Sequence, residues 1–160
     1  MVEKTLVTPA MVAQFSDPDE PILYQTTTAK LSRYNLSSSR TLIVTTEHLY
    51  VFESGKMSRK HKITNMTAFI KSTKSNECVL VFPHAKDLRL DGITDVQDLQ
   101  SIVQLRFVNK NPTDTLRIYA VPLKSLKDFA QVNKYGFSNL PHDNCRVIKE
   151  EFLGTKDLNE

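Results

Sequence analysis

The feature that most constrains this chain is a stretch of closely spaced β-type residues between positions 40 and 70. Residues 41–45 and 48–52 are rich in Leu, Ile, Val, Thr, Tyr and Phe, which fit a pleated and partly buried surface. Only Thr46 and Glu47 separate the two runs, so they predict a tight antiparallel hairpin.

A second turn and a third strand extend this hairpin into a meander. Residues 53–56 have the composition of a turn, in which Gly55 can adopt a positive φ. A basic segment at 56–62 follows as a loop, and residues 63–70 form the third β run. Because successive residues of a strand point to opposite faces, we expect one face of the hairpin to enter the core. The expected core residues are Leu42, Val44, Leu49, Val51, Val79, Val81 and Leu99.

The remaining pattern predicts further strands and three helices. We expect strands at residues 22–34, 78–82, 86–91 and 115–121, and helices within 1–15, from 94 to about 108, and at 125–136. Thr8 is expected to cap the first helix, with Pro9 at its first position. Thr94 and Gln97 fit a capping box at the second.

Six short strands followed by an amphipathic helix indicate an α+β, mainly β, fold. A curled antiparallel barrel whose open end is capped by the helix removes the edges that such strands otherwise present. We expect an N-terminal extension at 1–20, one domain at 21–136 and a C-terminal extension at 137–160. Within the domain, the strand and helix at 115–136 are additional to the barrel, or supply its seventh strand.

The phrase R-x-L-I-V-T-x-x-H-L-Y-V-F at residues 40–52 resembles the second and third strands of pleckstrin-homology (PH) domains. It is most similar to the tail-homology domain of class I myosins, where an LLLT-d-x-x-LY phrase recurs. Residues 82–88 stand where that family carries h-x-x-x-y-D-y. The resemblance extends over about residues 22–109 and implies a PH-like barrel with a capping helix.

Positive charge is concentrated in one part of the chain. Residues 21–76 contain nine basic and two acidic residues, a net charge of +7, whereas the remainder has 12 basic and 16 acidic residues, a net charge of −4. Such an asymmetry favours a surface that faces something anionic.

Several kinds of chemistry have no support in the sequence. The four glycines are too dispersed for a phosphate-binding loop, and the four histidines lack metal-ligand spacing, so we expect no enzyme activity, metal or cofactor. Asp95 and Asp98 are better explained by the helix dipole than by a cation. Cys78 and Cys145 are expected to be free thiols. We expect a cytoplasmic domain with no signal peptide and no transmembrane segment.

The PH resemblance implies a binding site for anionic headgroups. In PH domains that bind inositol phosphates, a lysine late in the first strand and an arginine early in the second face one pocket, and Lys30 and Arg40 match them. Ser38 departs from that pattern, because the family carries a basic residue there. Basic residues of the following loop add charge, so the expected site is Lys30, Arg40, Lys56, Arg59 and Lys60.

Two functions remain open at the level of sequence. One is a phosphoinositide-binding adaptor, peripheral to the membrane, that tethers a cytoskeletal partner. The other is a protein interaction module in a cytoskeletal or ciliary assembly, recognising an acidic protein surface such as tubulin without binding lipid. Nucleic acid is a weaker candidate, because exposed aromatic residues are not interleaved with the basic ones.

Overall fold

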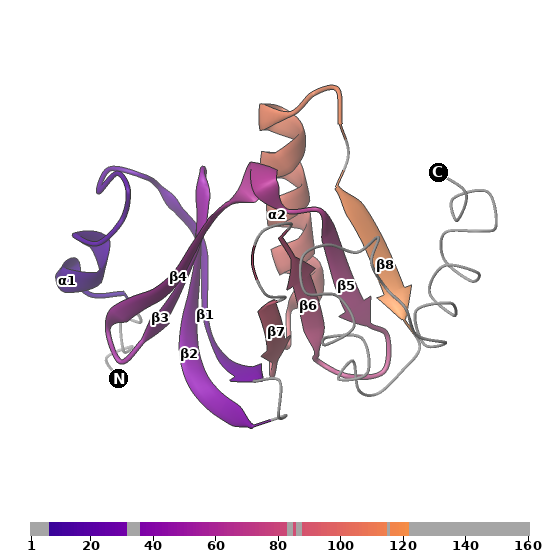
Figure 1. Ribbon diagram of the computed structural model, residues 1–160, viewed down its shortest axis with the longest axis horizontal. Coiled ribbons are helices and arrows are strands. Elements are labelled where there is room, and N and C mark those ends of the chain that lie inside the picture. Colours follow the sequence, from indigo (N-terminus) through magenta and orange to yellow (C-terminus); the bar gives the residue numbers. More distant parts are fainter. Residues whose placement is uncertain (1–6, 32–35, 83–84, 86–87, 115, 122–160) are drawn as a thin grey trace.

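The computed structural model describes residues 7–31, 36–82, 85, 88–114 and 116–121. The strands form one eight-stranded sheet in the order β4-β3-β2-β1-β7-β6-β5-β8, with one long helix against it (Figure 1). In chain order the elements are α1 (Pro9–Val12), β1 (Ile22–Leu31), β2 (Ser37–Thr45), β3 (His48–Glu53), β4 (Lys56–Lys62), the 3₁₀ helix η1 (Ile63–Asn65), β5 (Ala68–Ser72), β6 (Cys78–Val81), β7 (Leu88–Asp91), α2 (Val96–Lys110) and β8 (Arg117–Val121).

The predicted hairpin is confirmed in β2 and β3, and the predicted turn after β3 is confirmed at Ser54 and Gly55. Thr46 and Glu47 connect β2 to β3, and Leu42 lies opposite Val51 in the antiparallel register. Ser54 and Gly55 connect β3 to β4 with φ values of 50° and 82°. Two positive φ values are typical of the type I′ turn, whose twist matches that of the strands beside it.

The second half of the sheet continues from β1 through β7. Ala29 of β1 lies opposite Asp91 of β7, and β7, β6 and β5 follow as antiparallel neighbours. β8 then adds to the outer edge of β5 in parallel. The described strands therefore make an open sheet with β4 and β8 at its edges, and the pairing that would close a barrel is not formed among them.

The main core lies where the two halves of the sheet and α2 meet. Leu49 and Val51 from the first half pack in one cluster with Leu80 and Leu90 from the second. The helix contributes residues at helical spacing, and all seven residues predicted for the core are buried. The helix residues in the cluster are Leu99, Val103 and Phe107.

The start of α2 differs from the sequence prediction. Asp95, rather than Thr94, is the N-cap residue, and its side chain caps no backbone N–H. Instead, Asp95 Oδ1 accepts a hydrogen bond of 2.7 Å from Tyr24 Oη, and Gln97 Oε1 accepts one of 2.9 Å from Lys71 Nζ. The capping-box prediction is thus wrong, because these side chains join the helix to strands. Asp98 does lie in the first turn, as the dipole argument requires.

A second apolar cluster covers the opposite face of β2 and β3. Tyr50 and Phe52 point away from the main core and pack against Met11 and Phe15 of the N-terminal segment, residues 7–20. Phe15 stacks on Tyr50 with ring centroids 4.5 Å apart. α1 begins as predicted, since Met11 N donates to Thr8 Oγ1 at 3.2 Å. The N-terminal segment therefore contributes to the packing of the sheet (Figure 1).

The basic segment is a strand and not the predicted loop. Met57 and His61 of β4 are partly buried, whereas Lys60 and Lys62 are exposed, so this strand alternates. Lysine is common on edge strands because its charge prevents pairing with another chain. The predicted third β run at 63–70 is accordingly divided into η1 and β5.

Some sequence predictions fall on residues that the structure does not describe. These are the helix at 125–136, the extension at 137–160 and the pairing state of Cys145. Cys78 is a free, buried thiol. Across the described ranges, α2 and the shorter helices lack the length and apolar content needed to cross a bilayer.

Candidate functional site: the basic end of the sheet

The two faces of β2 and β3 provide the frame for placing the basic residues. Leu42 and Val51 point into the main core, and this side is called the core face. Ile43 and Tyr50 point toward the N-terminal segment, and this side is called the outer face. Because antiparallel partners project to the same side of a sheet, the register assigns each basic residue to one face.

Arg40 lies on the core face, two residues before Leu42. Its side chain is 12% exposed, and its Nη2 is 3.2 Å from Glu53 Oε2. Nη1 donates to the carbonyl oxygen of Ser39 at 2.9 Å. The buried Nε finds no hydrogen-bond partner among the described residues. Arg40 is thus a largely buried guanidinium held by one carboxylate and one carbonyl.

Lys30 is a close neighbour of Arg40 on the same face. It lies opposite Ser38 of β2 and Leu90 of β7, and Leu90 belongs to the main core. Arg40 is two residues beyond Ser38, so Lys30 and Arg40 are diagonal neighbours, about 7–8 Å apart at Cα. The structure therefore brings together the two residues that match the PH pattern.

A β-bulge determines which residues of β4 join them. Arg59 lies opposite Val51, but Met57 rather than Ser58 lies opposite Phe52, so Ser58 is the additional residue. Arg59 consequently shares the core face with Val51. Beyond the bulge, Lys56 lies opposite Glu53 and is also on the core face. Without the bulge, Lys56 would project to the same side as Lys60.

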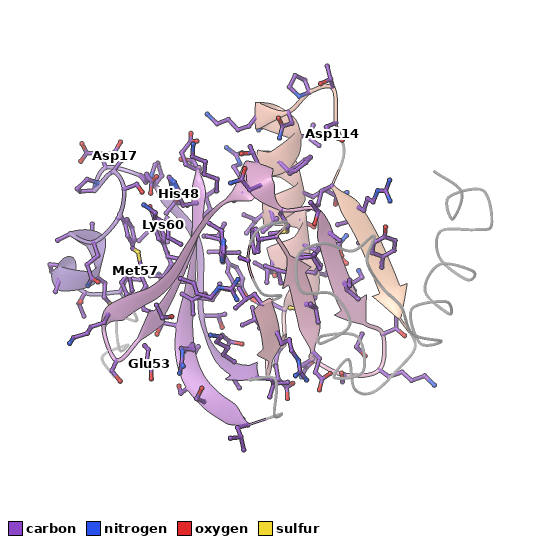
Figure 2. The ribbon with its side chains drawn as sticks, viewed as in Figure 1. Asp17, His48, Glu53, Met57, Lys60 and Asp114 are labelled. Atoms are coloured by element: carbon purple, nitrogen blue, oxygen red, sulfur yellow. The ribbon has the colours of Figure 1, made fainter. Side chains whose placement is uncertain are left out.

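Lys60 does not join the other four basic residues. It lies opposite Tyr50 on the outer face, and its Nζ donates to Ser16 Oγ at 3.1 Å. Figure 2 shows Lys60 and Met57 on the side of β4 that faces the N-terminal segment, with Glu53 near the β3–β4 turn. The predicted convergence of five residues is therefore wrong for Lys60, because β4 is a strand and alternates.

Arg59 is hydrogen-bonded to a histidine that is itself stacked on an aromatic ring. Its Nε donates to His61 Nε2 at 3.0 Å, and His61 stacks on Phe82 with ring centroids 3.9 Å apart. Burial lowers the pKa of His61 to about 4, and the charge of Arg59 lowers it further in the same direction. His61 is neutral at physiological pH, and Nε2 can therefore accept the hydrogen bond from Arg59.

A buried polar cluster on the outer face was not predicted from the sequence. Glu20 Oε1 lies 2.6 Å from His48 Nδ1, and Glu20 Oε2 accepts hydrogen bonds from Tyr50 Oη at 2.6 Å and Thr45 Oγ1 at 3.3 Å. Burial, and next the hydrogen bond to Glu20, raise the pKa of Tyr50 to about 12. These groups satisfy one another and fix the N-terminal segment. The sequence does carry one indication of this cluster: β3 is apolar on both faces, so a second segment of the chain must cover the face that points away from the main core.

The described residues contain no group of three or more His, Cys, Asp and Glu side chains arranged to hold a metal ion. The basic end of the sheet combines four cations with one carboxylate. It has the chemistry to bind an anion, through the charges and donors of Lys30, Arg40, Lys56 and Arg59.

Comparison with known proteins shows which solved structures have a similar fold. No protein-family model and no curated protein sequence matches the chain. The hSac2 domain from the human phosphoinositide phosphatase Sac2 superposes with a TM-score of 0.54 at 14% identity, covering 72% of this chain and 85% of that one.

Two structures of linker-DH/PH domains of p115-RhoGEF give TM-scores of 0.49 and 0.48, at 8% and 4% identity. They are covered over 35% and 31% of their lengths, so this chain spans about a third of each. Seven antiparallel-paired strands followed by a helix are the arrangement that the PH resemblance implies, and the hSac2 domain superposes on it over most of its length. The chain has a PH-like fold.

Proposed function

We propose that this chain is a non-catalytic binding module that attaches to phosphoinositide-containing membrane through the basic end of its sheet. The observation that carries the proposal is that four cations, Lys30, Arg40, Lys56 and Arg59, share the core face near the β1–β2 and β3–β4 connections. Arginine and lysine at such a site match phosphate oxygens in charge and hydrogen bonding.

The expected binding is weak and sensitive to salt. Each basic residue near an anionic surface contributes about 1 kcal/mol, and a bilayer surface potential extends over about one Debye length. Glu53 offsets part of the positive charge, because it is paired with Arg40. We propose further that the attached domain tethers a cytoskeletal partner to membrane, a role suggested by the resemblance of residues 40–52 to the tail-homology phrase of class I myosins.

Liposome co-sedimentation of the whole chain tests this proposal. Vesicles of phosphatidylcholine alone are compared with vesicles that also contain phosphoinositides, at low and at physiological salt. The phosphoinositide phosphatase that contains the hSac2 domain makes these lipids the first choice. We expect binding only to the phosphoinositide vesicles, decreasing as salt rises.

Two double variants with equal charge change provide the matched control. Lys56→Glu with Arg59→Glu reverses two cations on the core face of β4. Lys60→Glu with Lys62→Glu reverses two on its outer face, since Lys62 lies opposite His48. The first pair should abolish binding and the second should retain most of it. Equal loss in both would show that net charge, and not this site, mediates the attachment, and no binding of the unmodified chain would refute the proposal.

A second candidate is a protein interaction module that binds an acidic surface in a cytoskeletal or ciliary assembly. The observation that favours it is the arrangement of β4, an edge strand whose exposed residues are mostly lysine and whose outer face carries Lys60 and Lys62. Pelleting with microtubules or actin filaments separates the two functions. Here the outer-face double variant should lose binding and the core-face variant should retain it.

A further inference from the structure

Glu53 lies between Arg40 of β2 and the two basic residues of β4 on the core face. Its Oε2 is 3.2 Å from Arg40 Nη2, Lys56 lies directly opposite it across the hairpin, and Arg59 is its diagonal neighbour through Val51. A single carboxylate therefore lies among these three basic residues and is paired with Arg40. An anion bound at this end of the sheet would meet Glu53 first.

The two members of the Arg40–Glu53 pair differ in how firmly they are held. The Arg40 side chain is 12% exposed and is also bound through Nη1 to Ser39, whereas the Glu53 side chain is 55% exposed. Glu53 is the last residue of β3, next to the turn that begins at Ser54. The carboxylate can therefore rotate into solvent, while the guanidinium stays in place.

The guanidinium of Arg40 also has an unused donor beside this carboxylate. Nη2 and Nε lie on the same edge of a guanidinium, and such an edge can bind an oxyanion through two parallel hydrogen bonds. Glu53 is paired through Nη2, and the buried Nε has no partner among the described residues. A phosphate group with two oxygens on this edge would satisfy both donors. It would therefore bind Arg40 better than Glu53 does.

We propose that Glu53 is a displaceable internal counter-ion, which holds the phosphate position on Arg40 until a phosphate ligand replaces it. The inference rests on the proposed function and deepens it, because it names the phosphate position and the group that limits affinity there. The ligand is a phosphate monoester, from a membrane lipid or from a soluble inositol phosphate. Glu53 lowers the affinity for both by competing for the same donors.

Glu53→Gln is the variant that tests the inference, and Glu47→Gln is its matched control. Both remove one negative charge from a partly exposed glutamate that is paired with a basic residue. Glu47 is bound to Lys110 at 2.7 Å, in the β2–β3 turn at the other end of the strands. Affinity is measured with phosphoinositide vesicles and separately with soluble inositol trisphosphate, so that a lipid surface and a free headgroup are distinguished.

We expect Glu53→Gln to raise affinity by about 3- to 10-fold with both ligands, and Glu47→Gln to change it by less than about 2-fold, as surface ion pairs of this kind allow. A gain in affinity for vesicles but not for inositol trisphosphate would show that the phosphate group does not bind at Arg40. That result would overturn the inference. If the unmodified chain binds and the two variants behave alike, the inference fails while the proposed function stands. If none of the three binds either ligand, both fail.

A cycle with Arg40→Gln tests the mechanism of the gain. If Glu53 acts by competing for Arg40, Glu53→Gln should give little further gain once Arg40 is replaced. A gain that persists in full would show a general charge effect and overturn the inference. Because Arg40 is largely buried, the same cycle is repeated with the exposed Lys56→Gln, where the gain from Glu53→Gln should remain at least in part.

Discussion

Tyr50 Oη donates a hydrogen bond of 2.6 Å to Glu20 Oε2 on the face of β3 that points away from the main core. The same Tyr50 Oη accepts a hydrogen bond from Ser16 N at 3.0 Å. One side chain of the sheet thus binds two parts of the N-terminal segment. Glu20, which precedes β1 in sequence, is thereby buried among partners from β2 and β3.

We expect Tyr50→Phe to destabilise the domain by about 1–3 kcal/mol, because the buried Glu20 Oε2 loses its short hydrogen bond and keeps only the 3.3 Å one from Thr45 Oγ1. Tyr24→Phe is the matched control. Tyr24 Oη also donates to a carboxylate, Asp95 at 2.7 Å, but Asp95 is exposed and can bind water. Its loss should cost about 1 kcal/mol or less. Urea unfolding measures the loss in free energy of unfolding for each variant. Equal losses would show that the buried Glu20 carboxylate depends on the Tyr50 hydroxyl no more than the exposed Asp95 depends on Tyr24.

Leu49 tests the main core, since it is fully buried between the hairpin and the second half of the sheet. Leu49→Ala should lower the free energy of unfolding by about 2–5 kcal/mol, through lost apolar burial and the cavity left behind. Leu105→Ala, on the exposed side of α2, should change it by less than about 0.5 kcal/mol. An unchanged denaturant midpoint for Leu49→Ala would show that the hairpin does not pack in the main core.

The hairpin illustrates how much of the fold the sequence predicts. The connection at Thr46 and Glu47 and the turn at Ser54 and Gly55 depend on local backbone preferences, so short-range patterns were sufficient. The start of α2 depends instead on long-range contacts, and Asp95 bonds to Tyr24 rather than following the local capping pattern. Tertiary contacts of this kind are not visible in residue spacing.

The candidate site was predictable only in part, for a similar reason. Lys30 and Arg40 follow from the family pattern, and the register confirms that they are neighbours. The division between Lys56 and Lys60 depends on the bulge at Ser58, a single additional residue whose position no periodicity reveals. Glu53 was identified as a turn residue in the sequence, and only the structure shows it bound to Arg40.

Cys78 should be inert to thiol reagents in the native domain. It is fully buried, and burial, with smaller contributions from the charges of Asp91 and Glu77, raises the pKa of its thiol to about 12. Cys145→Ser isolates it for measurement. We expect labelling by a disulfide reagent to be slow in native buffer and immediate in denaturant. Rapid labelling under native conditions would indicate that β6 opens readily.

His61 should make the stability of the domain depend on pH below neutrality. Burial lowers its pKa from the ordinary 6.5 to about 4, so between these values the unfolded chain binds more protons than the folded one. Stability from His61 is therefore fully present above about pH 6.5 and is lost as the pH falls toward 4. The loss should be about 1–2 kcal/mol, less than the full shift implies, because the ring is partly exposed.

The comparison variant is His61→Gln, which is neutral at every pH and keeps an acceptor for Arg59. Urea unfolding of both proteins is measured between pH 4.5 and pH 7.5. Subtracting one free energy of unfolding from the other removes the contribution of the carboxylates, which both proteins share. We expect the stability difference, unmodified chain minus variant, to be constant above about pH 6.5 and to fall steadily below it. A difference that stays constant across the whole range would show that His61 titrates normally. It would then be free to protonate beside Arg59, and the hydrogen bond that orients Arg59 would be lost near pH 6.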